Sequence, residues 1–212
     1  MCPASADSCD NPTATCQIDT VYRGCFMMAE ENTLEGTQTK AFSRGCSGDQ
    51  NNRKEVISFT VGKGKYVRLS TEICNTDNCN AAKLEVPKEN TTKNGLQCPT
   101  CFSLNSDPCN SSVTPCMGDE TYCIDFAGIL QKATSASDIS TFVAKGCATT
   151  YAKDITTGSP LVSALSAFVF TKATAKPAEK LTNSGSSPAL GRFSFALYLP
   201  GLTGLLLVKL LS

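Results

Sequence analysis

The clearest alternation of hydrophobic and polar residues lies near the middle of the chain, in "EVISFTVGKGKYVRLST". Ile57, Phe59 and Val61 alternate with polar residues, and a second β-prone run covers Tyr66–Leu69 beyond Gly62–Gly64. Alternation on both sides of a glycine-containing turn predicts a β-hairpin. The letters "GKGK" in this turn do not match a phosphate-binding loop, which has four residues between its glycines and a helix after them.

Cysteines are the most unusual feature of the composition. The chain has 13 cysteines among 212 residues, and the last of them is Cys147. Cysteines this dense are typical of disulfides formed in an oxidising compartment. A zinc site would require further CxxC pairs or histidines, whereas the chain has one CxxC, Cys98–Cys101, and no histidine. We therefore interpret the cysteines as a structural framework rather than as metal ligands or a redox dithiol.

The cysteine spacing reveals an internal repeat. The gaps between Cys2, Cys9, Cys16, Cys25 and Cys46 are 7, 7, 9 and 21 residues, and those between Cys101, Cys109, Cys116, Cys123 and Cys147 are 8, 7, 7 and 24. Local sequences also agree, because "TATC" in the first half corresponds to "VTPC" in the second, and "FSRGC" corresponds to "VAKGC". One module is therefore used twice.

The second copy contains one cysteine that the first lacks. Cys98 lies three residues before Cys101, and its counterpart in the first copy would fall two positions before Met1. If that missing residue pairs with Cys25, it accounts for the odd number of cysteines. No basic and apolar leader follows Met1. We therefore favour a chain truncated at its N-terminus over unconventional export.

The segment between the two copies, residues 81–95, has the composition of a linker. It reads "AAKLEVPKENTTKNG", which is polar and contains a proline and an Asn-Gly pair. Asn90-Thr91-Thr92 in this segment is an N-glycosylation sequon, and Asn110-Ser111-Ser112 is a second. We expect both asparagines to lie on exposed loops and to carry glycans.

The end of the first module, "CNTDNCN" from Cys74 to Asn80, identifies a family resemblance. It resembles the closing signature of the urokinase-receptor and lymphocyte-antigen family, in which a short disulfide loop is followed by asparagine. The resemblance implies an all-β, disulfide-rich fold of two tandem three-finger, snake-toxin-like domains, at residues 1–80 and 96–180. It also implies that the Asn80 side chain bonds backbone near the first strand of its domain. Disulfides suit modules this small, which bury little apolar surface.

The resemblance further implies a disulfide pairing, with Cys25 left unpaired in this chain. The implied pairs are Cys2–Cys9, Cys16–Cys46, Cys74–Cys79, Cys98–Cys123, Cys101–Cys109 and Cys116–Cys147.

The chain departs from the family pattern at Ile73, where a cysteine is usual, and the second module has no closing loop after Cys147. Its third finger, residues 149–176, therefore lacks cross-links. The segment "PLVSALSAFVFTKATA" in that finger fits a strand or a helix, and we favour a strand.

The C-terminal tail has the order of a glycosylphosphatidylinositol attachment signal. Residues 181–192 are mostly small and polar, and residues 193–212 are mostly apolar and would be removed on attachment. We favour Asn183 as the attachment residue, with Ser184 and Gly185 as alternatives. A transmembrane helix and a buried core helix are the competing interpretations, but Pro200, two glycines and Lys209 interrupt the run.

Composition argues for a binding protein rather than an enzyme. Without histidine, no Ser-His-Asp or Cys-His arrangement can form, and we predict no cofactor and no catalytic or metal-binding residues. We interpret the Asp119-Glu120 pair as solvated charge. Because 19 basic residues balance 19 acidic ones, nucleic acid is not an expected partner.

The second module, with "NGLQCPTCF" and "CMGDETYCIDFAG", most resembles a two-domain branch of the family. That branch includes inhibitors of secreted phospholipases, a neutrophil surface antigen and a rodent bone surface protein. We therefore expect a lipid-anchored, cell-surface protein that binds an extracellular protein; the alternative is a soluble inhibitor of a secreted phospholipase. The sequence does not assign the binding finger. Tyr66, Arg68 and Phe102 are of the type that anchors interfaces, but they equally suit ordinary strand packing.

Overall fold

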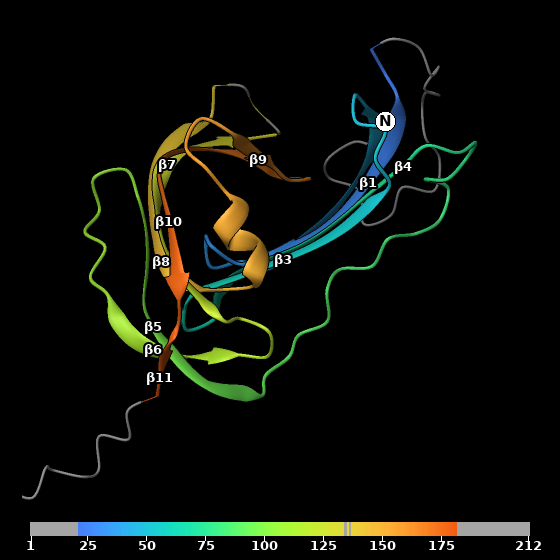
Figure 1. Cartoon of the computed structure of the whole chain (residues 1–212). Helices are drawn as coiled ribbons and strands as arrows, with labels where there is room; N and C mark the ends of the chain where they lie inside the picture. The colour runs from blue at the N-terminus through green and yellow to red at the C-terminus, as the bar shows by residue number, and fades with distance from the viewer. Residues whose placement is uncertain (1–20, 134, 136, 182–212) are drawn as a thin grey trace, which may run out of the picture. The chain divides into compact units, whose positions relative to one another are not determined.

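A computed structural model describes residues 21–133, 135 and 137–181 (Figure 1). The regular structure of the described chain is β-strand apart from one short 3₁₀ helix, η1 (Thr150–Asp154). The strands are β1 (Gly24–Asn32), β2 (Thr39–Ser47), β3 (Arg53–Gly62), β4 (Lys65–Cys74), β5 (Lys93–Leu104), β6 (Ser112–Met117), β7 (Tyr122–Lys132), β8 (Ile139–Ala148), β9 (Pro160–Val162), β10 (Ser166–Pro177) and β11 (Glu179–Lys180). The expected all-β, disulfide-rich fold is confirmed.

The described part of the first module, from residue 21, contributes two antiparallel hairpins, β1–β2 and β3–β4, and β1 also pairs with β4. The predicted hairpin is confirmed as β3–β4, with Gly64 at its turn. Gly64 has a φ of 67°, a backbone conformation that glycine adopts at little cost. The alternating side chains of Ile57, Phe59 and Val61 are buried, as a strand with one face toward a core requires.

The second module repeats this arrangement. The β5–β6 and β7–β8 hairpins are its first two fingers, and β10 pairs with β7 as β4 pairs with β1. The segment for which we favoured a strand contains β9 and β10, so that prediction is confirmed. Because β5 begins at Lys93, the last three residues of the predicted linker 81–95 belong to a strand.

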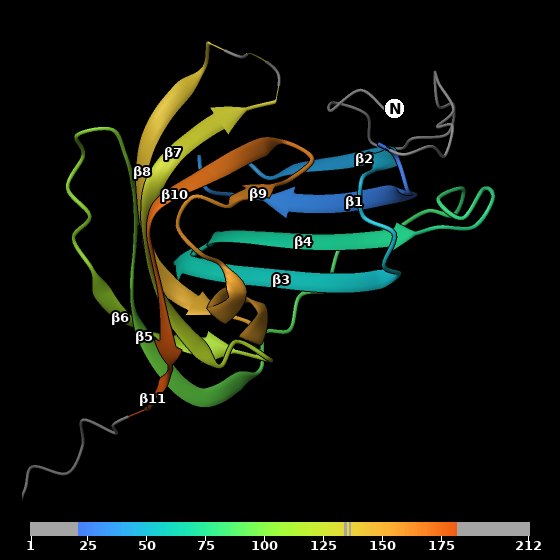
Figure 2. The same cartoon turned by 45° about the horizontal axis from the view of Figure 1, so that its top comes forward.

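The two modules are joined by strand pairing between β3 and β8. Phe59 lies opposite Ala148 and Thr60 lies opposite Cys147, and the Thr149 amide donates a hydrogen bond to the Ser58 carbonyl at 3.1 Å. The result is one continuous sheet in the order β2-β1-β4-β3-β8-β7-β10-β9, whose strands can be followed in Figure 2.

One hydrophobic core is built from residues of both modules. The first module contributes β3 and β4 side chains, and the second contributes aromatic residues of β7, β8 and β10. Phe59 of the first module contacts Phe126 of the second edge to face, with ring centroids 5.9 Å apart, and Phe126 contacts Phe170 at 5.0 Å. The core members are Leu34, Ile57, Phe59, Val61, Val67, Leu69, Ile124, Phe126, Leu130, Phe142, Ala144, Ala148, Ala152, Phe168 and Phe170.

The structure contains four of the disulfides that the resemblance implies. They are Cys74–Cys79, Cys98–Cys123, Cys101–Cys109 and Cys116–Cys147. Cys46 is also disulfide-bonded, but its expected partner Cys16 lies outside the described residues, as do Cys2 and Cys9. Cys25 carries a free thiol.

Four cysteines of the second module, Cys98, Cys116, Cys123 and Cys147, form a buried cluster. The sulfur atoms of Cys98, Cys116 and Cys147 lie within 4.8 Å of one another, which is close enough to share a metal ion. Each of these sulfurs is already in a disulfide and therefore has no thiolate to offer as a ligand.

The proposed attachment residues Asn183, Ser184 and Gly185 lie outside the described residues. Within the described part of the chain, no helix has the length and apolar character to cross a membrane.

Candidate functional site

A groove of about 520 Å³, which we call the inter-module groove, runs between the two modules of the described chain. Its floor is the face of β3 and β4 that carries Ser58, Thr60, Tyr66 and Arg68. Its sides are formed by the linker residues 87–91, by residues 113–115 and 117 of β6 and by the turn after β6. The other lining residues are Val56, Gly62, Lys63, Gly64, Asp119, Glu120 and Thr149. A groove of this size falls in the range of ligand sites, about 300–1,000 Å³.

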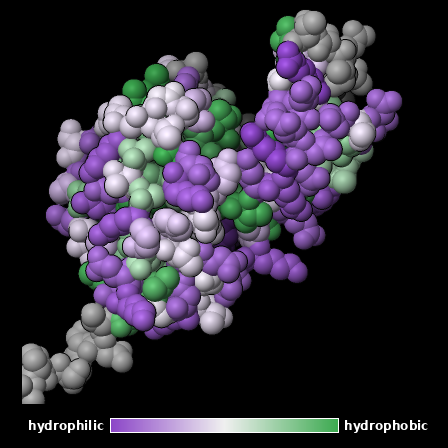
Figure 3. All heavy atoms as spheres, in the orientation of Figure 1, coloured by the Kyte–Doolittle hydropathy of each residue, from purple (hydrophilic) through white to green (hydrophobic). Residues whose placement is uncertain are grey.

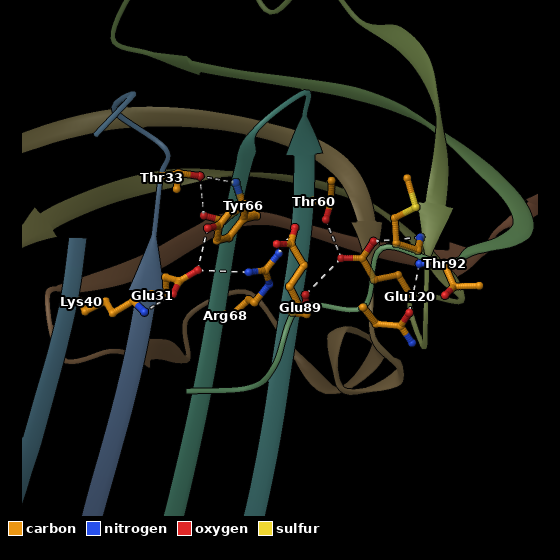
Figure 4. Close-up of polar contacts among 12 residues, drawn as sticks. Glu31, Thr33, Lys40, Thr60, Tyr66, Arg68, Glu89, Thr92 and Glu120 are labelled. Atoms are coloured by element: carbon orange, nitrogen blue, oxygen red, sulfur yellow. Dashed lines mark hydrogen bonds and ion pairs between the residues drawn. The ribbon is translucent and has the colours of Figure 1, made fainter. Parts of the chain in front are cut away.

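A polar network organises one end of the groove around Glu31 of β1 (Figure 4). The Tyr66 hydroxyl donates to the Glu31 carboxylate at 2.6 Å, and Arg68 and Lys40 pair with it at 3.1 and 3.0 Å. Burial alone would raise the pKa of Glu31, but the hydrogen bonds from Tyr66 and Lys40 outweigh it and hold the pKa below its ordinary value of 4.5. The Arg68 guanidinium also stacks 3.8 Å from the centre of the Tyr66 ring. Both side chains are therefore held in place before any partner binds.

Contacts with both modules hold the linker along the groove. Glu89 pairs with Arg68 at 3.0 Å, and the Thr92 carbonyl accepts a hydrogen bond from the Gly118 amide at 2.8 Å. The Asn94 side chain donates to the Gly118 and Glu120 carbonyls, each at 2.9 Å. The segment that joins the modules is therefore part of the folded groove wall.

Glu120, in the turn after β6, corrects a sequence prediction, because its side chain is buried rather than solvated. Its carboxylate accepts hydrogen bonds from the Ser58 and Thr60 hydroxyls at 3.1 and 2.7 Å, so it crosses from the second module to the first. Burial raises the pKa of Glu120, and the hydrogen bonds from Thr60 and Ser58 offset part of that rise. Its neighbour Asp119 is exposed, as expected.

Glu30 makes the reciprocal contact, from the first module to the second. Its side chain is fully buried and accepts a hydrogen bond from the Leu165 amide, in the β9–β10 turn, at 2.9 Å. Burial raises the pKa of Glu30, while hydrogen bonds from Ser163 and Leu165 lower it in part. Two buried carboxylates, one from each module, therefore fix how the modules meet. A local pattern could not have identified either one, because both are buried only after the modules associate.

Some of the residues that the sequence analysis singled out lie in the groove, and others lie elsewhere. Tyr66 and Arg68 line the groove, whereas Phe102 packs against the shared core with the Lys65 ammonium 5.6 Å from its ring centre. Asn90 is exposed at the groove edge, and Asn110 is exposed away from it. The Asn80 side chain donates to the Phe26 carbonyl of β1 at 3.5 Å.

The chemistry of the groove suits binding. Exposed aliphatic side chains, Val56 and Val113, stand at its edges beside the charged groups of its floor and rim. On the face drawn in Figure 3, hydrophilic residues cover most of the part that contains β1–β4, and hydrophobic patches gather over the part that contains β7–β10. Rigid walls that combine apolar and hydrogen-bonding groups favour recognition of another molecule.

Comparison with known proteins places both modules in one family. The family model described as the u-PAR/Ly-6 domain matches residues 1–82 and 94–169. Protein RoBo-1 of Rattus norvegicus is 28% identical over 141 residues, which cover 66% of this chain and 55% of RoBo-1. The phospholipase A2 inhibitor PIP of Malayopython reticulatus is 25% identical over 148 residues, covering 69% of this chain and 71% of the inhibitor. A gamma-type phospholipase A2 inhibitor chain from Elaphe climacophora is 34% identical over 83 residues, or 39% of this chain and 40% of that inhibitor chain.

The match therefore spans little more than half the length of RoBo-1. The fold agrees with the family match, because the described parts of both matched regions contain corresponding strand pairings, β4 with β1 and β10 with β7, and disulfides that the resemblance implies. Since the family model covers most of the chain and both copies of the repeat, the protein belongs to the u-PAR/Ly-6 domain family.

Proposed function

We propose that this protein is a non-catalytic, extracellular binding protein that is held at the outer leaflet of the plasma membrane by a lipid anchor. Its partner is an extracellular or cell-surface protein, and its binding surface is the inter-module groove. The observation that carries the proposal is the groove itself, a hollow of about 520 Å³ whose walls come from both modules and the linker. Family membership supports an extracellular binding role.

The anchor is supported by the order of residues in the tail, with small residues at 183–185 followed by a spacer and an apolar end. To test it, the full chain is expressed in mammalian cells behind a secretion signal and treated with phosphatidylinositol-specific phospholipase C. Release from the cell surface is the expected result. A matched variant with glutamate at residues 183–185 should not reach the surface as a releasable form. Wild-type protein that accumulates in the medium, or that stays on cells after treatment, would argue against the anchor.

Inhibition of a secreted phospholipase A2 is the second candidate function, and the names of the python and Elaphe relatives favour it. Direct binding to a panel of purified secreted phospholipases A2 tests both this candidate and the groove. Val56→Asp and Val113→Asp place a charge on exposed groove residues, and Val162→Asp is a control on an exposed valine outside the groove. Loss of binding in the first two variants alone would assign the groove. Equal binding by all three would remove the groove from this interaction.

A further inference from the structure

We propose that an N-glycan on Asn90 covers the inter-module groove, so that occupancy of this sequon controls access to the groove. The inference rests on the proposed extracellular location, because N-glycans are added to exported chains. Three features of the structure carry it: the position of Asn90 on the groove wall, the way its side chain is fixed, and a second sequon placed elsewhere.

Asn90 belongs to the linker wall of the groove and is exposed. The groove lining also includes Val113, Pro115 and Met117 of β6. A groove of about 520 Å³ is comparable with sites that enclose a drug-sized molecule. The first few sugar rings are therefore enough to fill or cover it, and their apolar faces can pack on the aliphatic and proline side chains of the walls.

The root of the glycan is held in one orientation by the fold. The Asn90 amide oxygen accepts a hydrogen bond from the Thr92 backbone amide at 3.0 Å. On its other side, Asn90 packs so closely on Gly118 that a Cβ at position 118 would lie 2.8 Å from its Cβ, Cγ and Nδ2 atoms. Gly118 has a φ of 50° and its amide is bonded to the Thr92 carbonyl. Asn90 is therefore fastened to the turn that closes the groove, and a glycan on Nδ2 starts at the groove margin.

The second sequon provides a control within the same chain. Asn110 is exposed, follows the Cys101–Cys109 loop and does not line the groove. A glycan at Asn110 adds the same bulk and solubility at another surface. Any effect that is specific to Asn90 therefore reports position rather than glycosylation in general.

The absence of tryptophan from the chain allows a direct measurement. Val56→Trp introduces a single tryptophan in the groove at a side chain that is 46% exposed, and Val162→Trp introduces one outside it at 51% exposure, so that excitation selective for tryptophan over the five tyrosines reports on one site. The full chain is expressed in mammalian cells behind a secretion signal, glycan occupancy is determined by mass spectrometry, and quenching by acrylamide is compared with and without the Asn90 glycan. Asn90→Gln and Thr92→Ala each remove the sequon, Thr92→Ser retains it, and Asn110→Gln removes the control sequon.

We expect the acrylamide quenching constant of the Val56→Trp protein to rise by about two-fold when the Asn90 sequon is removed, because a bulky glycan no longer shields the groove. Thr92→Ser, Asn110→Gln and the Val162→Trp background should leave quenching unchanged. If the Val56→Trp protein is not secreted, Val113→Trp reports on the same groove. An unoccupied Asn90, or an occupied Asn90 with unchanged quenching at Val56→Trp, would overturn the proposal. Because no partner is used, this result is independent of whether the groove binds a phospholipase.

Discussion

At the scale of single residues, Glu120 is a central residue of the contact between the two modules. It is 4% exposed and supplies the acceptor for two hydroxyls of the first module, Ser58 and Thr60. Glu120→Ala leaves both hydroxyls without this acceptor in a partly buried site, so we expect the free energy of unfolding to fall by about 2 kcal/mol. Urea denaturation of the disulfide-intact protein measures the loss.

The neighbouring residue is a matched control for this prediction. Asp119 has the same charge, is exposed, and lies in the same turn after β6. Asp119→Ala should change the free energy of unfolding by less than about 0.5 kcal/mol. Equal losses in the two variants would mean that Glu120 contributes only a surface charge.

The two buried carboxylates also predict a pH dependence. Burial raises the pKa of both Glu30 and Glu120 above the ordinary value of 4.5. A group with a raised pKa in the folded state contributes stability that is fully present below its unfolded pKa and is lost as pH rises through the folded pKa. Glu31 acts in the opposite sense, because its pKa is lowered and its contribution is lost as pH falls.

A double variant, Glu30→Gln with Glu120→Gln, isolates this effect because glutamine does not titrate. The free energy of unfolding of the wild type, minus that of the double variant, should decrease as pH rises from 4.5 toward neutral. Urea denaturation at a series of pH values gives this difference. A difference that stays constant or grows with pH would show that burial does not control these two carboxylates.

At the scale of elements, the junction between β3 and β8 depends on a close backbone approach at Gly146. A Cβ at this position would lie 2.2 Å from the Thr60 carbonyl oxygen. Gly146→Ala must therefore push β8 away from β3, and we expect it to lower the free energy of unfolding by about 1–3 kcal/mol. Hydrogen exchange should become faster at the Thr149 amide, which is bonded across the junction to the Ser58 carbonyl.

Gly62 is the control for the junction, because the nearest atom to a Cβ built there is 3.8 Å away, an ordinary contact. Gly62→Ala lies at the end of β3 and should leave exchange at Thr149 unchanged. Faster exchange in both variants would indicate a general loosening of β3 rather than a clash at the junction.

Local signals predicted the elements well, and they failed where separate elements meet. Alternation predicted the β3–β4 hairpin, and the family resemblance implied four disulfides that the structure contains. The β3–β8 junction left one trace in the sequence, the glycine of "VAKGC", but its counterpart Gly45 instead faces the Phe26 ring. A repeated glycine therefore does not reveal which strand approaches it. Glu120 was misinterpreted for the same reason, because its two hydroxyl donors, Ser58 and Thr60, come from a strand about 60 residues away in sequence.

At the scale of the whole described chain, the shared core decides how the two modules behave. Residues of both modules pack in one cluster, and the contact between Phe59 and Phe126 crosses between them. Tandem domains with separate cores can move and unfold independently. Here the sheet is also continuous through the β3–β8 pairing, so neither module can lose its structure without exposing part of the other's core.

We therefore expect the two modules to unfold in one cooperative transition. Differential scanning calorimetry should show a single peak with equal calorimetric and van't Hoff enthalpies. Ile57→Ala tests the coupling, because Ile57 is 1% exposed and belongs to the first module. It should lower the free energy of unfolding by about 2–5 kcal/mol and shift the whole peak, since a cavity in the shared core weakens both modules. Hydrogen exchange in β7 of the second module should accelerate to the same extent. Two resolved transitions, or a loss of protection confined to β1–β4, would mean that the modules keep separate stabilities despite their common core.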